Sequence, residues 1–210
     1  MNEGNYHHEN LREELIENGL KILDADGYDG FSLRKVAKAC GVSHTAPYRH
    51  FKDKDDLIAA IAAKVLHQFN ESLRVAIAQY PGDIRGQVNE MGCAYVQFFV
   101  ENPAYLRLVF LSDIGKQVNE KLVNNGVILE NPENTFYEVI NRYADEGRAA
   151  EPTDAMERKA LALGAWGLVH GITVLLVKGD FSYDGDPMEL VRKIIWKHVG
   201  LGRKPSVNDV

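Results

Sequence analysis

A short segment from Ser43 to His50 concentrates hydrogen-bonding side chains and contains no acidic ones. Six of its eight residues carry a hydroxyl, imidazole or guanidinium group: Ser43, His44, Thr45, Tyr48, Arg49 and His50. Such groups hydrogen-bond to the edges of bases, and hydroxyls and cations also hold phosphates. The composition therefore favours contact with a nucleic acid. The alternative is a solvated polar turn between core helices.

The charge around this segment differs from the charge of the whole chain. The 210 residues have a formal net charge of −6, whereas nucleic-acid-binding domains are usually basic. Between residues 34 and 54, six cations accompany one anion, Asp53, which gives a local balance of +5. The cations are Arg34, Lys35, Lys38, Arg49, Lys52 and Lys54. A small basic patch predicts weak non-specific binding and a need for two copies, because each copy neutralises few phosphates.

Start and stop signals around the segment predict three helices. Ser32 is a good N-cap for a helix whose apolar residues share one face, namely Leu33, Val36, Ala37 and Cys40. Gly41 can adopt the left-handed conformation that ends a helix. Ser43 is expected to cap a short second helix that runs to about Phe51, and Asp53 is expected to cap a third. Two helices joined by a short glycine-containing turn form a helix-turn-helix, which places its second helix in the DNA major groove.

These residues resemble the tetracycline-repressor (TetR) family of bacterial regulators. The motifs that carry the likeness are Gly41-Val42-Ser43, Tyr48-Arg49-His50-Phe51 and Lys54-Asp55-Asp56-Leu57, after a first helix from Tyr6 that stops at Gly27. The likeness covers about residues 6 to 69. The sequence departs from it at Thr45, where many members have glycine, and at Pro47, where many have leucine or isoleucine. A shorter stretch, Trp166 to Gly171, resembles the Trp…His-Gly signature of one C-terminal subgroup.

The resemblance implies a ligand-responsive, sequence-specific DNA-binding transcriptional regulator. We expect a cytoplasmic homodimeric repressor that a small molecule releases from an inverted-repeat operator. The expected fold is all-α, with a three-helix helix-turn-helix DNA-binding domain at residues 6–53 and a larger helical ligand-binding and dimerisation domain at residues 54–202. The residues expected to contact DNA are Ser32, Arg34, Ser43, His44, Thr45, Tyr48, Arg49, His50, Lys52 and Lys54. Among them Ser43, His44, Thr45 and Tyr48 are expected near bases, and Arg34, His50, Lys52 and Lys54 at phosphates.

The rest of the chain has apolar residues at helical spacing and no alternating strand pattern. Prolines and glycines separate the helices that we expect, and Gly179 is one of these boundaries. The predicted helices span about residues 54–80, 83–100, 103–111, 113–124, 132–146, 153–178 and 186–199. The first of them is expected to join the two domains.

One predicted helix contains eighteen residues without a formal charge, from Ala160 to Val177. This length is near the threshold for a membrane span. His170 and three glycines lower its hydrophobicity, however, and no second span accompanies it. A helix that is apolar all round is more simply buried in a core or between subunits. By the resemblance, this helix and the last one would form a four-helix dimer interface with their twins.

Aromatic residues are frequent in the middle helices. The ordinary interpretation of each one is a core residue, whereas the resemblance implies a small-molecule pocket with apolar walls and a few polar groups. The residues expected to line such a pocket are Tyr95, Phe98, Phe99, Tyr105, Phe110, Tyr137, Trp166 and His170. For His170, a core or interface role is as consistent with the sequence as a ligand contact.

Other classes of function find less support. Cys40 and Cys93 provide neither a disulfide framework nor a metal-ligand spacing, and nothing cationic near Cys93 in the sequence favours a redox switch. No nucleophile with its base can be assembled from local spacing, so we expect no enzyme, no cofactor and no metal. The remaining alternative is a DNA-binding or protein-interaction adaptor on the same fold, without a small-molecule inducer.

Overall fold

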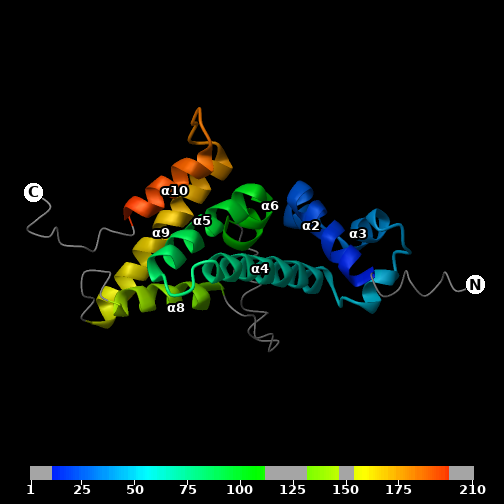
Figure 1. Ribbon diagram of the computed structural model, residues 1–210. Coiled ribbons are helices and arrows are strands. Elements are labelled where there is room, and N and C mark those ends of the chain that lie inside the picture. Colours follow the sequence, from blue (N-terminus) through cyan, green and yellow to red (C-terminus); the bar gives the residue numbers. More distant parts are fainter. Residues whose placement is uncertain (1–10, 112–131, 147–153, 199–210) are drawn as a thin grey trace, which may run out of the picture. The chain divides into compact units, whose positions relative to one another are not determined.

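The computed structural model describes residues 11–111, 132–146 and 154–198, and every regular element within these ranges is a helix (Figure 1). The elements are α2 (Leu11–Gly30), α3 (Leu33–Ala39), η1 (Ala46–Arg49), α4 (Lys54–Ala78), α5 (Ile84–Glu101), α6 (Pro103–Leu106), η2 (Arg107–Leu111), α8 (Pro132–Asp145), α9 (Ala155–Lys178) and α10 (Pro187–His198). The all-α prediction is confirmed. The predicted helix at 113–124 lies outside the described residues.

The chain divides into two compact units. The first, which we call the head, comprises residues 1–66 and 104–129, and the second, the body, comprises residues 67–103 and 130–210. Helix α4 contributes its first half to the head and its second half to the body. The expected domain boundary after residue 53 stays a prediction.

The core of the head forms where α2, α3 and the first half of α4 turn their apolar faces inward. The side chains of Leu15, Val36 and Leu57 are completely buried there. Gly19 lets α2 approach α4 closely, since a Cβ atom at this position would lie 2.9 Å from Ile61 Cδ1. At the predicted end of the first helix, Gly27 has φ 67° and ψ −177°, which breaks the helical conformation. The glycine signal was therefore correct.

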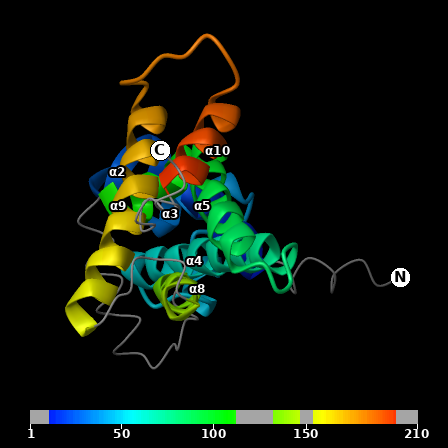
Figure 2. The same cartoon turned by 60° about the vertical axis from the view of Figure 1, so that its left-hand side comes forward.

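Helix α5 is the centre of the body, where it contacts α8, α9 and α10 (Figures 1 and 2). Gly92 gives α9 and α10 room, because a Cβ atom there would lie 3.2 Å from Ile195 and 3.4 Å from Val169. The buried Gln87 connects α8 to the preceding turn, since it accepts from Arg142 Nη2 at 2.9 Å and donates to Tyr80 O at 2.8 Å. These contacts fix α5 among its neighbours.

The predicted helix at 103–111 needs a correction. It is α-helical only through residue 106, and Arg107–Leu111 forms a π-helical turn. Apolar spacing alone does not distinguish hydrogen bonding to the fourth residue from bonding to the fifth, so the π-helical turn could not be predicted from it. Within the head, Arg107 donates two hydrogen bonds to Asp24 Oδ1, at 2.6 and 2.9 Å.

Helix α9 is capped at both ends. Asp154 accepts from the amides of Met156 and Glu157 at 2.7 and 2.8 Å, and Gly179 ends the helix with φ 71°. Among the described helices, α9 alone is long and apolar enough to cross a membrane, and 17% of its apolar window is buried within the chain. Most residues of this apolar window are therefore not buried by the rest of the described chain.

Candidate nucleic-acid interface

The turn between α3 and η1 has the geometry that the sequence predicts for a helix-turn-helix. Ser32 is extended, with φ −155° and ψ 147°, and its Oγ accepts from the amide of Lys35 at 3.3 Å. Gly41 has φ 68°, a conformation that costs little only for glycine. The amide of Val42 then donates to Ala37 O at 3.0 Å, which closes the end of α3. The caps at Ser32 and Gly41 therefore bound α3 where the sequence predicts its start and its end.

The segment from Ser43 to His50, which we call the reading turn, differs from the expected second helix. Its helical part is a four-residue 3₁₀ turn, η1, whose N-cap is Thr45 instead of Ser43. A helix capped at Ser43 would lack its first hydrogen bond, from residue 47 to Ser43 O, because the nitrogen of Pro47 has no hydrogen to donate. The amide of Ala46 donates to Ser43 O instead, at 3.0 Å. The expectation that Ser43 caps this element is therefore wrong.

The polar side chains of this reading turn are directed to solvent. Ser43, His44 and Thr45 are exposed, and 60% of Tyr48 is exposed. Pro47, in contrast, is buried, so it anchors the turn to the head. Of the six side chains that the sequence singles out for hydrogen bonding, all but the half-buried His50 are thus exposed.

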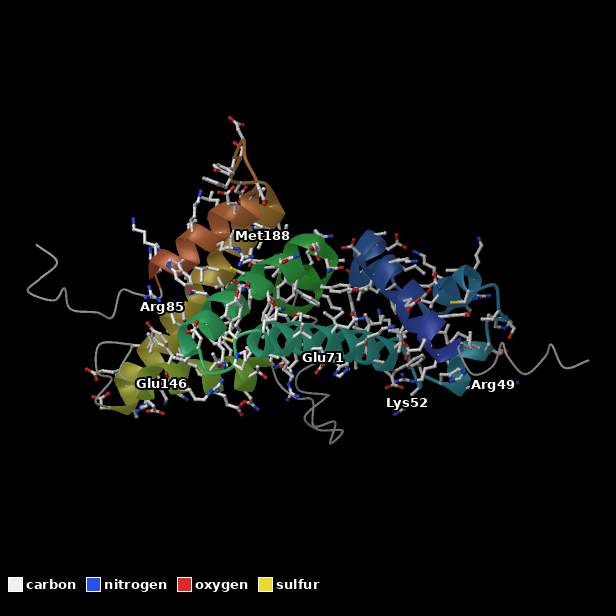
Figure 3. All side chains as sticks on the ribbon, in the orientation of Figure 1. Arg49, Lys52, Glu71, Arg85, Glu146 and Met188 are labelled. Atoms are coloured by element: carbon white, nitrogen blue, oxygen red, sulfur yellow. The ribbon has the colours of Figure 1, made fainter. Side chains whose placement is uncertain are left out.

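Exposed cations surround the reading turn. Among the described residues, no ion pair involves Arg34, Lys38, Arg49 or Lys52, and all four are exposed. Figure 3 shows two of them, Arg49 and Lys52, extending from this part of the head. Lys35 instead pairs with Asp26 at 2.7 Å. The local charge available to phosphates is consequently smaller than the sequence balance suggests.

Lys54, which was expected at a phosphate, is half-buried and packs on α2. Its Nζ lies 3.8 Å from the centroid of the Tyr28 ring and donates to Tyr28 O at 3.4 Å. The Tyr28 hydroxyl donates to Asp55 Oδ1 at 2.8 Å, and this hydrogen bond raises the pKa of Tyr28. The position of the Lys54 ammonium is therefore set by an aromatic ring as well as by its own helix.

The start of α4 follows the expected capping. Asp53 Oδ1 accepts from the amide of Asp56 at 2.9 Å, and Asp56 Oδ2 accepts from the amide of Lys52 at 3.0 Å. This reciprocal pair satisfies amides on both sides of the helix start. It also fixes the backbone that carries Lys52 and Lys54.

All ten residues expected at DNA lie in the head. Ser32 and His50 are half-buried, and the Ser32 oxygen is already used as a cap. Sequence reasoning left Lys38 out of the site although it counted the residue in the local charge. It also missed Tyr28, whose contact with Lys54 joins residues too distant in the chain for a local pattern to reveal.

In the body, five of the eight residues expected in a pocket lie together. They are Tyr95, Phe98, Phe99, Trp166 and His170, and Phe69, which the sequence reasoning missed, packs among them. Of the other three, Tyr137 is 40% exposed on α8, and Tyr105 and Phe110 belong to the head. The expected set is therefore divided between the two units.

A polar chain crosses this aromatic group. Trp166 Nε1 donates to the Tyr95 hydroxyl oxygen at 3.2 Å, and that hydroxyl lies 2.9 Å from His170 Nδ1. Burial raises the pKa of Tyr95 and lowers the pKa of His170. The arrangement is satisfied when Tyr95 is a neutral phenol that donates to an unprotonated Nδ1.

Burial also decides the state of the Cys93 thiol, which was considered as a redox switch. The side chain is 3% exposed, and burial raises its pKa to about 11. The thiol is therefore protonated near neutral pH, which disfavours oxidation chemistry.

Two family models match the chain. Residues 15–61 match the bacterial regulatory proteins of the tetR family, and residues 88–196 match the tetracyclin repressor-like C-terminal domain. The chain belongs to the TetR family of transcriptional regulators. It is a DNA-binding regulator of the helix-turn-helix type, and the match to the family's regulatory-protein model at residues 15–61 of this TetR protein includes the turn between α3 and η1.

Relatives and solved structures agree with membership in the TetR family. The HTH-type transcriptional regulator YobS of Bacillus subtilis is 25% identical over 175 residues, which cover 83% of each chain. An HTH-type transcriptional regulator of Staphylococcus aureus is 28% identical over 99 residues, and the match spans 47% of this chain and 52% of the relative.

Among solved structures, a Rhodococcus protein of unknown function is 25% identical, with a TM-score of 0.70 and coverage of 93% of this chain and 98% of the other. The regulator FadR of Bacillus subtilis in complex with stearoyl-CoA has a TM-score of 0.69 at 15% identity and covers 91% of this chain and 99% of that one. At this identity the second likeness concerns the TetR fold alone.

Proposed function

We propose that this TetR protein is a cytoplasmic homodimeric repressor that leaves an inverted-repeat operator when its body binds a small molecule. Residues 6–53 would provide the DNA contacts, and residues 54–202 would provide the ligand site and the dimer interface. The observation that carries the dimer is the apolar surface of the last two helices. Leu163 and Leu175 of α9 are 63% and 47% exposed, and Trp196 of α10 is 53% exposed.

A second copy is the occupant that best explains this surface. Large apolar side chains exposed on neighbouring helices of one unit mark an interaction site. Each head offers few cations to DNA, so two heads on one two-fold axis would double the phosphate contacts and impose a two-fold symmetric operator. Substitution of Leu163 and Leu175 by Asp should then give monomers in analytical ultracentrifugation and abolish tight operator binding. A monomeric wild-type protein at micromolar concentration would contradict the dimer.

Binding selection on randomised duplex DNA at two salt concentrations tests the operator. An enriched inverted repeat is expected, with affinity that falls as salt rises. Within it, His44→Ala should change the preferred sequence, whereas Lys52→Ala should weaken all sequences alike and flatten the salt dependence. Equal losses on operator and random DNA for both variants would contradict this division between base and phosphate contacts.

The proposed ligand site is the aromatic group around Tyr95 and His170. Its walls are apolar rings, and the hydroxyl and imidazole give it a polar side, which is the usual chemistry of small-molecule sites. A structural neighbour was crystallised with stearoyl-CoA, so an acyl-CoA is a reasonable probe. Stearoyl-CoA should release the selected operator in fluorescence anisotropy, with free coenzyme A as the control. If a broad metabolite screen releases no DNA, an adaptor without an inducer becomes the better interpretation.

A further inference from the structure

Two hydroxyls of the reading turn are held together. Ser43 Oγ and Thr45 Oγ1 lie 3.1 Å apart, and both side chains are exposed. Either oxygen can be the donor. One hydrogen is therefore used between them, and the pair offers one remaining hydroxyl hydrogen together with free lone pairs on the other oxygen. The exposed pair therefore combines one hydrogen that it can donate with a neighbouring oxygen that can accept.

We propose that this Ser43–Thr45 hydroxyl pair reads one adenine in each half of the operator, an inference that rests on the proposed function. In the major groove adenine presents an acceptor, N7, beside a donor, the N6 amino group. One hydroxyl donates to N7 while the other accepts from N6. Guanine presents two acceptors at the same place, N7 and O6, and the pair can donate to both only if its own Ser43–Thr45 hydrogen bond is broken, so adenine is favoured.

The local backbone makes the pair rigid enough for this task. The Ala46 amide donates to Ser43 O at 3.0 Å, and the Tyr48 amide donates to Thr45 O at 3.3 Å, so both residues are tied into the turn. Pro47, buried beneath them, fixes the turn to the head. Amino acids that hold a donor and an acceptor side by side, as Asn and Gln do, are the usual readers of adenine. Here two short side chains would together supply what one amide supplies elsewhere.

The test is binding selection with the full chain and four variants: Ser43→Ala, Thr45→Val, the double variant and Thr45→Ser. The wild-type protein should prefer adenine to guanine at one position of each half-site by about 10-fold, as expected for a bidentate contact. Ser43→Ala and Thr45→Val should each reduce that preference to about 2-fold or less, at the same position, because a hydroxyl without its neighbour no longer presents both groups. The double variant should lose no more than either single one, and Thr45→Ser should retain the preference.

A matched control is Ser72→Ala, which removes a hydroxyl of the body that donates to Phe69 O at 2.7 Å. It should leave the selected sequence unchanged. Circular dichroism and the melting temperature establish that each variant is folded before selection.

The outcomes separate the inference from the proposed function. A clear inverted repeat whose adenine preference survives in both single variants would overturn the hydroxyl pair and leave the proposed function standing. Additive effects of the two substitutions at two different positions would also overturn it, because they would mean two independent contacts. No enriched sequence with the wild-type protein would remove both.

Discussion

A polar side chain in the core of the body should lower the stability of this protein. Asn89 of α5 is 2% exposed, and neither its Nδ2 nor its Oδ1 has a hydrogen-bond partner among the described residues. Burial of an amide without a partner costs about 1–3 kcal/mol in protein mutational data. Leucine has the same branched outline without the polar atoms. We therefore expect Asn89→Leu to raise the free energy of unfolding by about 2 kcal/mol.

Asn70 provides the matched control. It is also buried, with 0% exposure, but its Oδ1 accepts a hydrogen bond from Thr135 Oγ1 at 2.7 Å. Asn70→Leu leaves that hydroxyl without its acceptor and should cost about 1–3 kcal/mol. Asparagine-to-leucine substitution is thus expected to raise the free energy of unfolding at residue 89 and to lower it at residue 70, because the Asn70 side chain accepts a hydrogen bond from Thr135.

Urea unfolding at one fixed protein concentration measures both variants, because an oligomer's apparent stability depends on concentration. The midpoint should rise for Asn89→Leu and fall for Asn70→Leu, with the slope unchanged. For a chain of this length, about 2 kcal/mol corresponds to roughly 4–8 °C in melting temperature. A loss of stability for Asn89→Leu comparable to that of Asn70→Leu would refute the reasoning, since it would mean that the native state uses the Asn89 amide.

Three further predictions concern the aromatic group, α9 and the start of α4. Burial lowers the pKa of His170, so the unfolded state binds more protons than the native state as the pH falls through 6.5, and the free energy of unfolding should fall with it. Urea unfolding at pH 7.5 and pH 5.5 should show a smaller fall for His170→Asn than for the wild-type protein. A Cβ atom at Gly167 would meet open space within one chain, so Gly167→Ala should stabilise α9 by up to about 1 kcal/mol. If α9 packs against its twin in the proposed dimer, the added methyl group should instead raise the dimer dissociation constant, which sedimentation equilibrium measures. Tyr28→Leu removes the aromatic ring that contacts the Lys54 ammonium, whereas Tyr28→Phe removes only the hydroxyl. In thermal unfolding, the leucine variant should therefore lose about 0.5–1 kcal/mol more stability than the phenylalanine variant. Equal losses would mean that only the hydroxyl of Tyr28 stabilises the head.

Local signals predicted most of the helix boundaries. Ser32, Asp53 and Gly179 each act within one turn of their own position, and the structure places a cap or a helix end at every one of them. Apolar spacing was equally informative for α5, α8 and α10, because each must direct one face to the body core. These features need only the sequence within a few residues, so they are accessible without a structure.

Features that depend on hydrogen-bond register or on distant residues were not predictable in this way. The sequence contained Pro47, but the sequence alone does not show that the element begins at Thr45 and takes 3₁₀ hydrogen bonds. The π turn at Arg107–Leu111 has the same apolar spacing as an α-helix. Tyr28 and Lys54 lie on different helices, and no periodicity relates them. The candidate site was therefore predicted as a set of residues, and not as an arrangement of atoms.

The arrangement of atoms changes how the reading turn should be understood. A regular recognition helix presents separate side chains along one face, and each can contact its own base. The 3₁₀ turn from Ala46 to Arg49 is too short for that, and Ser43 and Thr45, which precede it, contact each other through hydroxyl oxygens 3.1 Å apart. Pro47 bears on this part of the turn, because it removes the first hydrogen bond of a helix capped at Ser43 and is itself buried in the head. Specificity in this protein should therefore depend on two short side chains that lie in contact just before the 3₁₀ turn, and one of them, Thr45, is a position at which the sequence departs from the family pattern.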